Sequence, residues 1–280
     1  MIPLKITGFH RGLVARLASM LVALAGSGFA AGSASQVVPD TPASILPLTA
    51  VRLLDGSPFT AAVKANRDYM LALEPDRLLA PFRREAGLPA KAESYGNWES
   101  GGLDGHTAGH YLSALANMIA SGEDTPDGQL RHRLDYMVGE LNDCQKAYGD
   151  GYIGGVPGSR ALWTAVAAGD VDAVNRKWVP WYNLHKTFAG LRDAWLETGN
   201  ITARDVLIHF GDWCVTLTSK LSDEQMQRML NQEHGGMDEL MADIYASTGA
   251  RKYLTTAQRF KHHAILDPLE QNRDELTGKH

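Results

Sequence analysis

The sequence predicts an all-α protein that is built from stacked helical hairpins. Apolar residues recur at helical spacing along most of the chain after about residue 60, and no stretch keeps the alternation that marks a strand. Three segments also repeat one plan: a polar entrance that carries histidine, an apolar helix, a glycine stop and a second helix. Hairpins of this length cannot bury their apolar faces singly, so we expect them to stack in a ring with the first helix of each pair inside.

The clearest helix covers residues 237–248. Its apolar positions follow the spacing of one buried helix face: Met237, Leu240, Met241, Ile244 and Tyr245. The first turn is acidic, as the helix dipole favours, and Gly249 follows as a stop. Two glycines before the helix let the backbone turn sharply, so we expect Glu233 and His234 at the mouth of a buried helix.

The remaining elements follow from the same spacing and from glycine and proline breaks. We expect an extended lead-in at 36–60 and one helical domain at 61–280. Further helices are expected at 61–73, 108–122, 129–147, 184–199, 203–219 and 252–263. The segment 76–105 carries two prolines and five glycines, so we expect a long irregular loop of the kind that often carries function.

The entrances of the repeated segments bring similar side chains to one end of the expected ring. The residues that we expect to contact a ligand there are Asp104, His106, His185, Glu233, His234 and, where a further entrance is due, His280. Imidazole and carboxylate groups hydrogen-bond to hydroxyls, and nearby tryptophans offer apolar faces to sugar C–H groups. The set therefore predicts a sugar-binding cup.

Cleavage of a glycosidic bond usually needs a proton donor together with a base or nucleophile. The carboxylates available for such roles are Glu99, Asp104, Glu233 and Glu239. Structural roles are the alternative: Glu233 and His234 can cap the helix, and His185 can bond to the adjacent loop. We interpret Trp178 and Trp181 as packing residues, and His262 and His263 as surface residues on an outer helix. A metal ion bound jointly by His106, His185 and His234 is a further alternative, but no ligand spacing near these residues supports it.

Composition narrows the range of partners. The 27 basic and 32 acidic residues give a net charge of −5 without a block of like charge, so nucleic acid is not an expected partner. The two cysteines, Cys144 and Cys214, continue apolar helix faces and have no neighbouring ligand at metal spacing. We expect two buried thiols and no zinc site in this chain, with a disulfide left open.

Residues 1–35 have the pattern of a secretory signal. Lys5, Arg11 and Arg16 precede an apolar run at 17–25, which is too short to span a bilayer. We therefore expect an exported protein, periplasmic or extracellular, with no membrane anchor. The alternative is an N-terminal helix that docks on the body of the protein.

Several longer motifs resemble one enzyme family. They are DRLLAPFR at 76–83, GLDGHTAGHYLSA at 102–114, GYIGGVP at 151–157, VPWYNLHK at 179–186 and EHGGM at 233–237. In this order they are similar to the bacterial β-L-arabinofuranosidases of glycoside hydrolase families 127 and 146. The resemblance implies an (α/α)6 barrel that removes terminal arabinofuranose from plant glycans, with His185, His234 and His280 holding the sugar.

The family's mechanism, as the resemblance implies it, uses a zinc-bound cysteine nucleophile and a glutamate acid/base. Those motifs are expected C-terminal to the position that matches His280, where this chain ends. We therefore expect roughly the first half of the barrel, and a chain that is catalytically silent by itself, with zinc required only by the full-length enzyme. The alternatives are a non-catalytic carbohydrate-binding fragment, or another toroid enzyme such as an unsaturated-uronyl hydrolase or a sugar epimerase.

Overall fold

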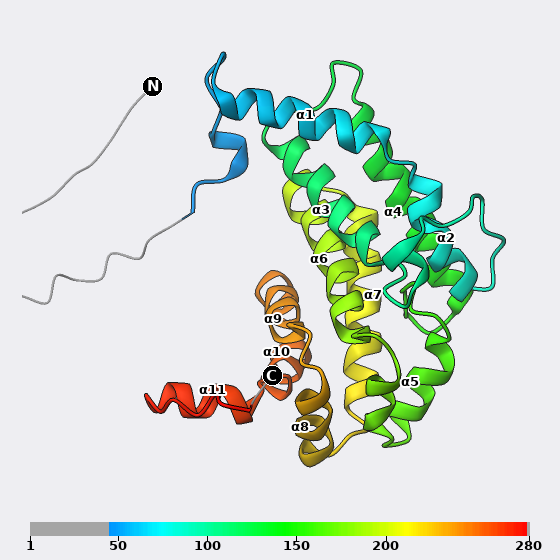
Figure 1. Cartoon of the computed structure of the whole chain (residues 1–280), viewed down its shortest axis with the longest axis vertical. Helices are drawn as coiled ribbons and strands as arrows, with labels where there is room; N and C mark the ends of the chain where they lie inside the picture. The colour runs from blue at the N-terminus through cyan, green and yellow to red at the C-terminus, as the bar shows by residue number, and fades with distance from the viewer. Residues whose placement is uncertain (1–44, 279–280) are drawn as a thin grey trace, which may run out of the picture. The chain divides into compact units, whose positions relative to one another are not determined.

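The computed structural model describes residues 45–278, and these are all-helical, as predicted. They contain eleven α-helices, three short 3₁₀-helices and no strand (Figure 1). In chain order the elements are η1 (Leu48–Ala50), α1 (Pro58–Ala72), α2 (Pro75–Glu85), η2 (Asn97–Ser100), α3 (His106–Ala120), α4 (Gln129–Tyr148), α5 (Ser159–Ala167), η3 (Val171–Arg176), α6 (Pro180–Thr198), α7 (Ile201–Thr218), α8 (Asp223–Gln232), α9 (Met237–Thr248), α10 (Arg251–Arg259) and α11 (His263–Glu270). The predicted signal at 1–35 lies outside the described residues.

The three predicted hairpins are α3–α4, α6–α7 and α9–α10, and they stack in two layers (Figure 1). The first helices form one layer, in which α6 packs between α3 and α9. The second helices form the other layer, in which α7 packs between α4 and α10. The predicted stops Gly122, Gly199 and Gly249 all adopt left-handed backbone conformations, with φ of 79°, 74° and 70°. This is the arrangement of successive hairpins in part of an (α/α)6 barrel, which confirms the predicted fold class.

Helices α3 and α6 touch through their backbones. A Cβ atom on Gly109 would lie 2.1 Å from the carbonyl oxygen of Lys186, and one on Gly190 would lie 2.6 Å from the carbonyl oxygen of Gly109. Only glycine allows two helices to approach this closely. Gly190 also lies against Leu112, one turn further along α3, so the two helices run parallel. Their N-terminal ends are therefore side by side.

The loop after α4 packs beneath the N-terminal end of α3. A Cβ on Gly155 would lie 2.6 Å from the carbonyl oxygen of Asp104, so this loop also needs glycine at the contact. Tyr152 from the same loop is fully buried, 4.9 Å from the ring of Trp213 and 6.0 Å from that of Phe210. This aromatic core holds the loop, and with it the start of α3, against the second-layer helices.

The structure corrects several predicted elements. The segment 76–105 is not wholly irregular, because α2 forms inside it and buries Leu78, Leu79 and Phe82. Pro81 lies within that helix and hid it from the pattern. The helix expected at 252–263 ends at Arg259, and α11 starts separately at His263. Helices α5 and α8 were also missed, although α8 begins with a capping box at Ser222.

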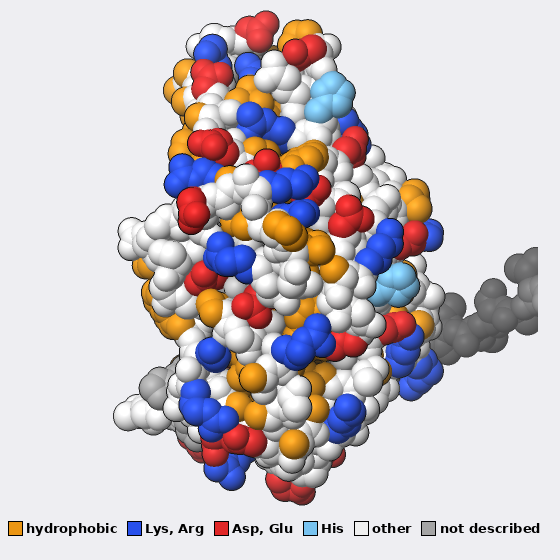
Figure 2. All heavy atoms as spheres, turned by 90° about the vertical axis from the view of Figure 1, so that its right-hand side faces the viewer, with side chains coloured by type: hydrophobic (Ala, Val, Ile, Leu, Met, Phe, Trp, Pro, Cys, Tyr) orange, Lys and Arg blue, Asp and Glu red, His pale blue; other side chains and the backbone are white. Residues whose placement is uncertain are grey.

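The surface of the described residues mixes charges of both signs. Figure 2 shows Lys and Arg side chains interspersed with Asp and Glu over one whole face, without a continuous region of either sign. Within residues 45–278, no helix has the length and apolar character needed to cross a membrane.

Candidate functional site

The N-terminal end of α3 is capped from outside the helix. Its N-cap residue, Gly105, provides no side chain, so the first N–H groups of the helix need another acceptor. Glu99, buried in η2, supplies it: Oε2 accepts from the N–H of Gly105 at 2.7 Å and Oε1 from that of Thr107 at 3.0 Å. A carboxylate at this position also meets the positive end of the helix dipole.

The same carboxylate holds His106. The ring Nδ1 lies 2.8 Å from Oε1 of Glu99 and 2.7 Å from the carbonyl oxygen of Leu103. Both neighbours are acceptors, so Nδ1 carries a proton and only Nε2 remains for a ligand. Burial opposes the charged imidazolium, but these hydrogen bonds outweigh burial and raise the pKa of His106.

Two of the predicted carboxylates, Glu99 and Asp104, accept hydrogen bonds from backbone N–H groups of the fold. Burial would raise the pKa of Glu99, but its hydrogen bonds with His106, Thr107 and Gly105 outweigh that effect and lower the pKa. Asp104 is buried too, and its Oδ2 accepts from the N–H of Gly102 at 2.9 Å. Burial raises the pKa of Asp104. A ligand contact by Asp104 therefore stays a prediction.

The N-terminal end of α6 adds three polar side chains beside His106. The ring of Tyr182 lies 6.3 Å from that of His106, and the ammonium of Lys186 lies 4.5 Å from the centre of the Tyr182 ring. On α3, the exposed ring of His110 lies 6.0 Å from His106. Burial, followed by the charges of Lys186, His106 and His185, lowers the pKa of His110. The starts of two successive hairpins therefore lie side by side and form one polar surface.

We name this surface the entrance cluster, and its members are His106, His110, Tyr182, His185 and Lys186. Within it, His185 is mostly buried, its Nδ1 has no hydrogen-bond partner among the described residues, and its Nε2 lies 3.4 Å from Oε2 of Glu239. Burial, reinforced by the charge of Lys186, lowers the pKa of His185. His185 is therefore neutral at pH 7, whereas His106 is held closer to its charged form.

At the third entrance, Glu233 and His234 point to different parts of the structure, although they are adjacent in sequence. Glu233 is buried and turns to the preceding hairpin, where its Oε1 accepts from the N–H of Tyr182 at 2.7 Å. It thus caps α6, not the helix that follows it, because the N-cap Val179 has no capping side chain. The other oxygen, Oε2, is buried without a partner among the described residues, and burial raises the pKa of Glu233 to about 7.

His234 lies exposed at the outer side of the same entrance. Its ring is 5.3 Å from that of His262, and both line a hollow of about 200 Å³ with residues of α11. His262 was interpreted as a surface residue, which is wrong: it is buried, and its Nε2 is 2.8 Å from Oδ1 of Asn231. His280 lies outside the described residues. Ligand contacts by Glu233, His234 and His280 remain predictions.

Two exposed tryptophans flank the entrance cluster, and neither was predicted as a site residue. The side chains of Trp98 and Trp178 are 60% and 46% exposed, and their rings meet edge to face at 6.3 Å. Trp98 also lies 6.2 Å from the ring of His106. In contrast, Trp181 is fully buried, as its packing interpretation required. A usable signal was the position of Trp98 within the segment 76–105, which is expected to be a functional loop.

No group of three or more His, Cys, Asp and Glu side chains within residues 45–278 could hold a metal ion. Cys144 and Cys214 are both buried free thiols, as the periodicity predicted. Burial raises the pKa of Cys144 to about 12 and raises that of Cys214 as well. Neither thiol has the thiolate character that metal binding or nucleophilic attack requires.

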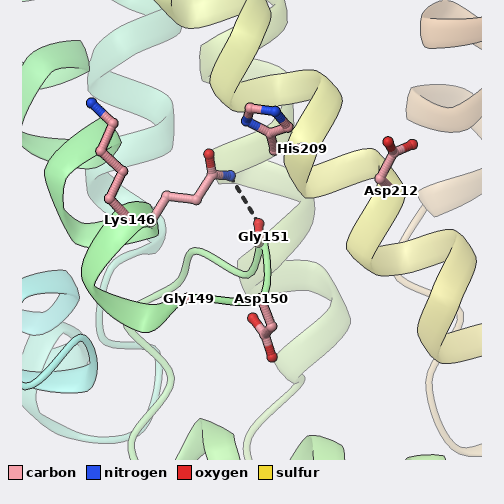
Figure 3. Close-up of a pocket in the computed structure, with 7 residues that line it drawn as sticks. Lys146, Gly149, Asp150, Gly151, His209 and Asp212 are labelled. Carbon is pink, nitrogen blue, oxygen red and sulfur yellow. Dashed lines mark hydrogen bonds between the residues drawn. The ribbon is translucent and has the colours of Figure 1, made fainter.

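A second polar hollow lies between the C-terminal end of α4 and the side of α7 (Figure 3). It measures about 320 Å³, and its charged or ionisable lining residues are Lys146, Asp150, His209 and Asp212. Figure 3 shows that these side chains point away from one another, and the hydrogen bond drawn there, from Gln145 to the carbonyl of Gly151 at 2.8 Å, closes the loop. The hollow has no converging groups comparable to the entrance cluster.

Layered hairpins with polar residues gathered at the starts of the first helices define a protein of the (α/α) toroid class. A family model described as "Beta-L-arabinofuranosidase, GH127 catalytic domain" matches residues 50–280. The chain therefore belongs to this family, which confirms the resemblance drawn from its motifs.

A solved structure of a GH127 beta-L-arabinofuranosidase from Geobacillus stearothermophilus T6 is also similar to the chain. The two share 16% sequence identity with a TM-score of 0.44, over 79% of this chain and 33% of the other. The chain thus spans about a third of the length of that protein. No curated protein matches it.

Proposed function

We propose that this chain is the sugar-binding part of a glycoside hydrolase of the β-L-arabinofuranosidase type. In this role it binds the terminal arabinofuranose of a glycan. The observation that carries the proposal is that His106, at the start of one hairpin, lies beside Tyr182, at the start of the next, which places His185 on the adjoining turn of α6. Membership of the family supplies the substrate class. The side chains that line the hollow between α4 and α7 point away from one another, and the described residues contain no cluster that could hold a metal ion.

The entrance cluster has the donors and acceptors that a sugar needs. His106 is fixed by Glu99 through Nδ1, which leaves its Nε2 for a hydroxyl, while neutral His185 has Nε2 beside Glu239 and a buried Nδ1 without a partner among the described residues. Lys186 adds three donors, and burial lowers its pKa. Hydroxyl groups on adjacent sugar carbons match such a mixed set, because each hydroxyl both donates and accepts.

Cleavage of the glycosidic bond is assigned to no described residue. Glu99 is committed to capping α3, and Glu239 is exposed and paired with Arg192. The zinc ion implied by the family does not fit the described residues, because they offer no ligand cluster and their thiols are buried. We therefore route no step through a metal here.

The test is direct binding of methyl β-L-arabinofuranoside to the 280-residue chain, measured by calorimetry. We expect saturable binding that weakens about tenfold or more in His185→Ala, because buried polar contacts are lost. The matched control is His132→Ala, an exposed histidine of α4, which should bind like the wild type. Absence of saturable binding, or equal losses in both variants, would contradict the proposal.

A chromogenic β-L-arabinofuranoside distinguishes holding from cleavage. The present assignment predicts no release of the chromophore by this chain, although the glycoside binds. Turnover above the rate of the buffer would show that the chain contains its own catalytic groups.

A further inference from the structure

Trp98 and Trp178 form an exposed aromatic pair on the surface of the fold. Their rings lie at 86° to each other, so one ring face stays open while its neighbour's edge supports it. Large aromatic side chains contribute most stability when buried, as Trp181 is, and an exposed pair of them usually marks a binding surface.

Each tryptophan has a neighbour with a left-handed backbone. Among the described non-glycine residues, positive φ occurs only at Asn97, Val179 and Asn272. The first, at 66°, directly precedes Trp98, and the second, at 39°, directly follows Trp178. A β-branched residue such as valine is rarely found there, and strain of this kind concentrates at functional sites.

A glycine pair packs beneath the two tryptophans. A Cβ on Gly101 would lie 3.0 Å from the carbonyl oxygen of Asn97, and one on Gly102 would lie 3.4 Å from Cβ of Trp178. The second contact joins two segments that are far apart in sequence. The two segments are thus positioned jointly, and the ring of Trp98 lies 6.2 Å from that of His106.

We propose that Trp98 and Trp178 form an aromatic platform for the second sugar ring of an arabinose-containing chain. The inference rests on the proposed function, in which the entrance cluster holds the terminal ring. A sugar presents C–H groups on one face, and these pack against an aromatic face, while its rim hydroxyls stay in water. The pair lies beside the polar cluster rather than within it, so it contacts the next ring of the glycan. The site thereby selects chains over single sugars.

The experiment compares two ligands on one set of variants. The ligands are methyl β-L-arabinofuranoside and the methyl glycoside of a β-L-arabinofuranosyl disaccharide, and calorimetry gives Kd for each. Wild type should bind the disaccharide about tenfold more tightly, because an aromatic contact dominates the added interface. Trp98→Ala and Trp178→Ala should reduce this preference to within about twofold and leave monosaccharide affinity nearly unchanged.

Two further variants separate the platform from general damage. Trp178→Phe keeps a ring face and should retain most of the preference for the disaccharide. Tyr69→Ala removes an equally exposed aromatic side chain from α1, 63% exposed, and should change nothing. Circular dichroism verifies that each variant is folded.

The outcomes are distinguishable from those of the proposed function. If His185→Ala abolishes monosaccharide binding while both tryptophan variants keep the disaccharide preference, the platform is rejected and the proposed function stands. An equal loss for both ligands also rejects the platform, since the tryptophans would then only support the entrance cluster. If wild type binds neither ligand, the proposed function fails, and the platform fails with it.

Discussion

Glu99 and Glu233 perform the same structural task at neighbouring helices, yet their proton affinities shift in opposite directions. Each is a buried carboxylate that caps a first-layer helix from a separate segment: Glu99 caps α3 and Glu233 caps α6. The pKa of Glu99 is lowered, whereas that of Glu233 is raised to about 7. Burial favours the neutral form of both.

The number of hydrogen-bond partners explains the difference. Glu99 accepts from two backbone N–H groups and from the ring of His106, so both of its oxygens are satisfied as an anion. Glu233 accepts through Oε1, but its Oε2 is buried without a partner among the described residues. A half-satisfied buried carboxylate prefers to hold a proton. The position of a carboxylate at a helix N-terminus therefore does not by itself determine whether that carboxylate is charged.

The largest expected effect on stability comes from a substitution that separates the N-terminal ends of α3 and α6. Gly109→Ala places a methyl group 2.1 Å from the carbonyl oxygen of Lys186, so α3 and α6 must move apart. We expect a loss of about 3 kcal/mol or more in the free energy of unfolding, since overpacking at a backbone contact cannot be relieved by a rotamer change. Urea denaturation measures this loss.

The control is Gly139→Ala on α4, where a Cβ meets nothing within 4 Å. It should stabilise the helix by about 0.5–1 kcal/mol, because alanine has the higher helix propensity. Similar effects at both positions would show that the close contact between α3 and α6 does not exist in solution.

Removal of the Glu99 side chain is the next largest effect. Glu99→Ala leaves the N–H groups of Gly105 and Thr107 and the ring of His106 without their acceptor. We expect a loss of about 3 kcal/mol, because charge-assisted hydrogen bonds of buried groups are removed together. In the same denaturation assay Glu233→Ala should lose less free energy of unfolding than Glu99→Ala. Equal losses would show that the two capping carboxylates do not differ in their contribution to stability.

The pH dependence of stability should distinguish the two glutamates by sign. The folded-state pKa of Glu233 is raised from 4.5 to about 7, so its contribution is present below about pH 4.5 and is lost as pH rises toward 7. The wild-type advantage over Glu233→Gln should therefore fall by about 3 kcal/mol at most between pH 4.5 and pH 8.

Glu99 should behave in the opposite way. Its folded-state pKa is lowered, so its contribution is present above its unfolded value near 4.5 and is lost as pH falls through the lowered pKa. Denaturation of wild type and Glu99→Gln across this acidic range measures the effect. If the two variants show the same sign of pH dependence, hydrogen-bond number is not what separates them.

The smallest effect concerns the residues at which α3 and α6 begin. The N-cap of α3 is Gly105 at φ 99°, which is an ordinary conformation for glycine, whereas the N-cap of α6 is Val179 at φ 39°. Val179→Asn should raise stability by about 1 kcal/mol, because asparagine tolerates the left-handed region. Thermal unfolding measures it. Val179→Thr keeps a β-branched side chain and should gain nothing, so a gain in both variants would point to polarity rather than strain.

Local patterns predicted the hairpins well because helix formation depends on nearby residues. The helix expected at 237–248 has those bounds in the structure, and Gly199 and Gly249 end helices as expected. The family motifs led to the same fold class, and a family model matches residues 50–280. Pro81 concealed α2, because a proline inside a helix is uncommon and its cost is offset by the burial of neighbouring apolar residues.

The sequence by itself determined the period and the order of the hairpin helices and the glycines that follow the first helix of each pair, all of which depend on contacts within a few residues. Only the tertiary structure decided which helix Glu233 caps, that His262 is buried, and that Trp98 and Trp178 meet beside His106. Each of those outcomes joins segments that are far apart along the chain. The meeting of Trp98 and Trp178 also depends on the close approach of α3 and α6, which glycine at 109 and 190 allows.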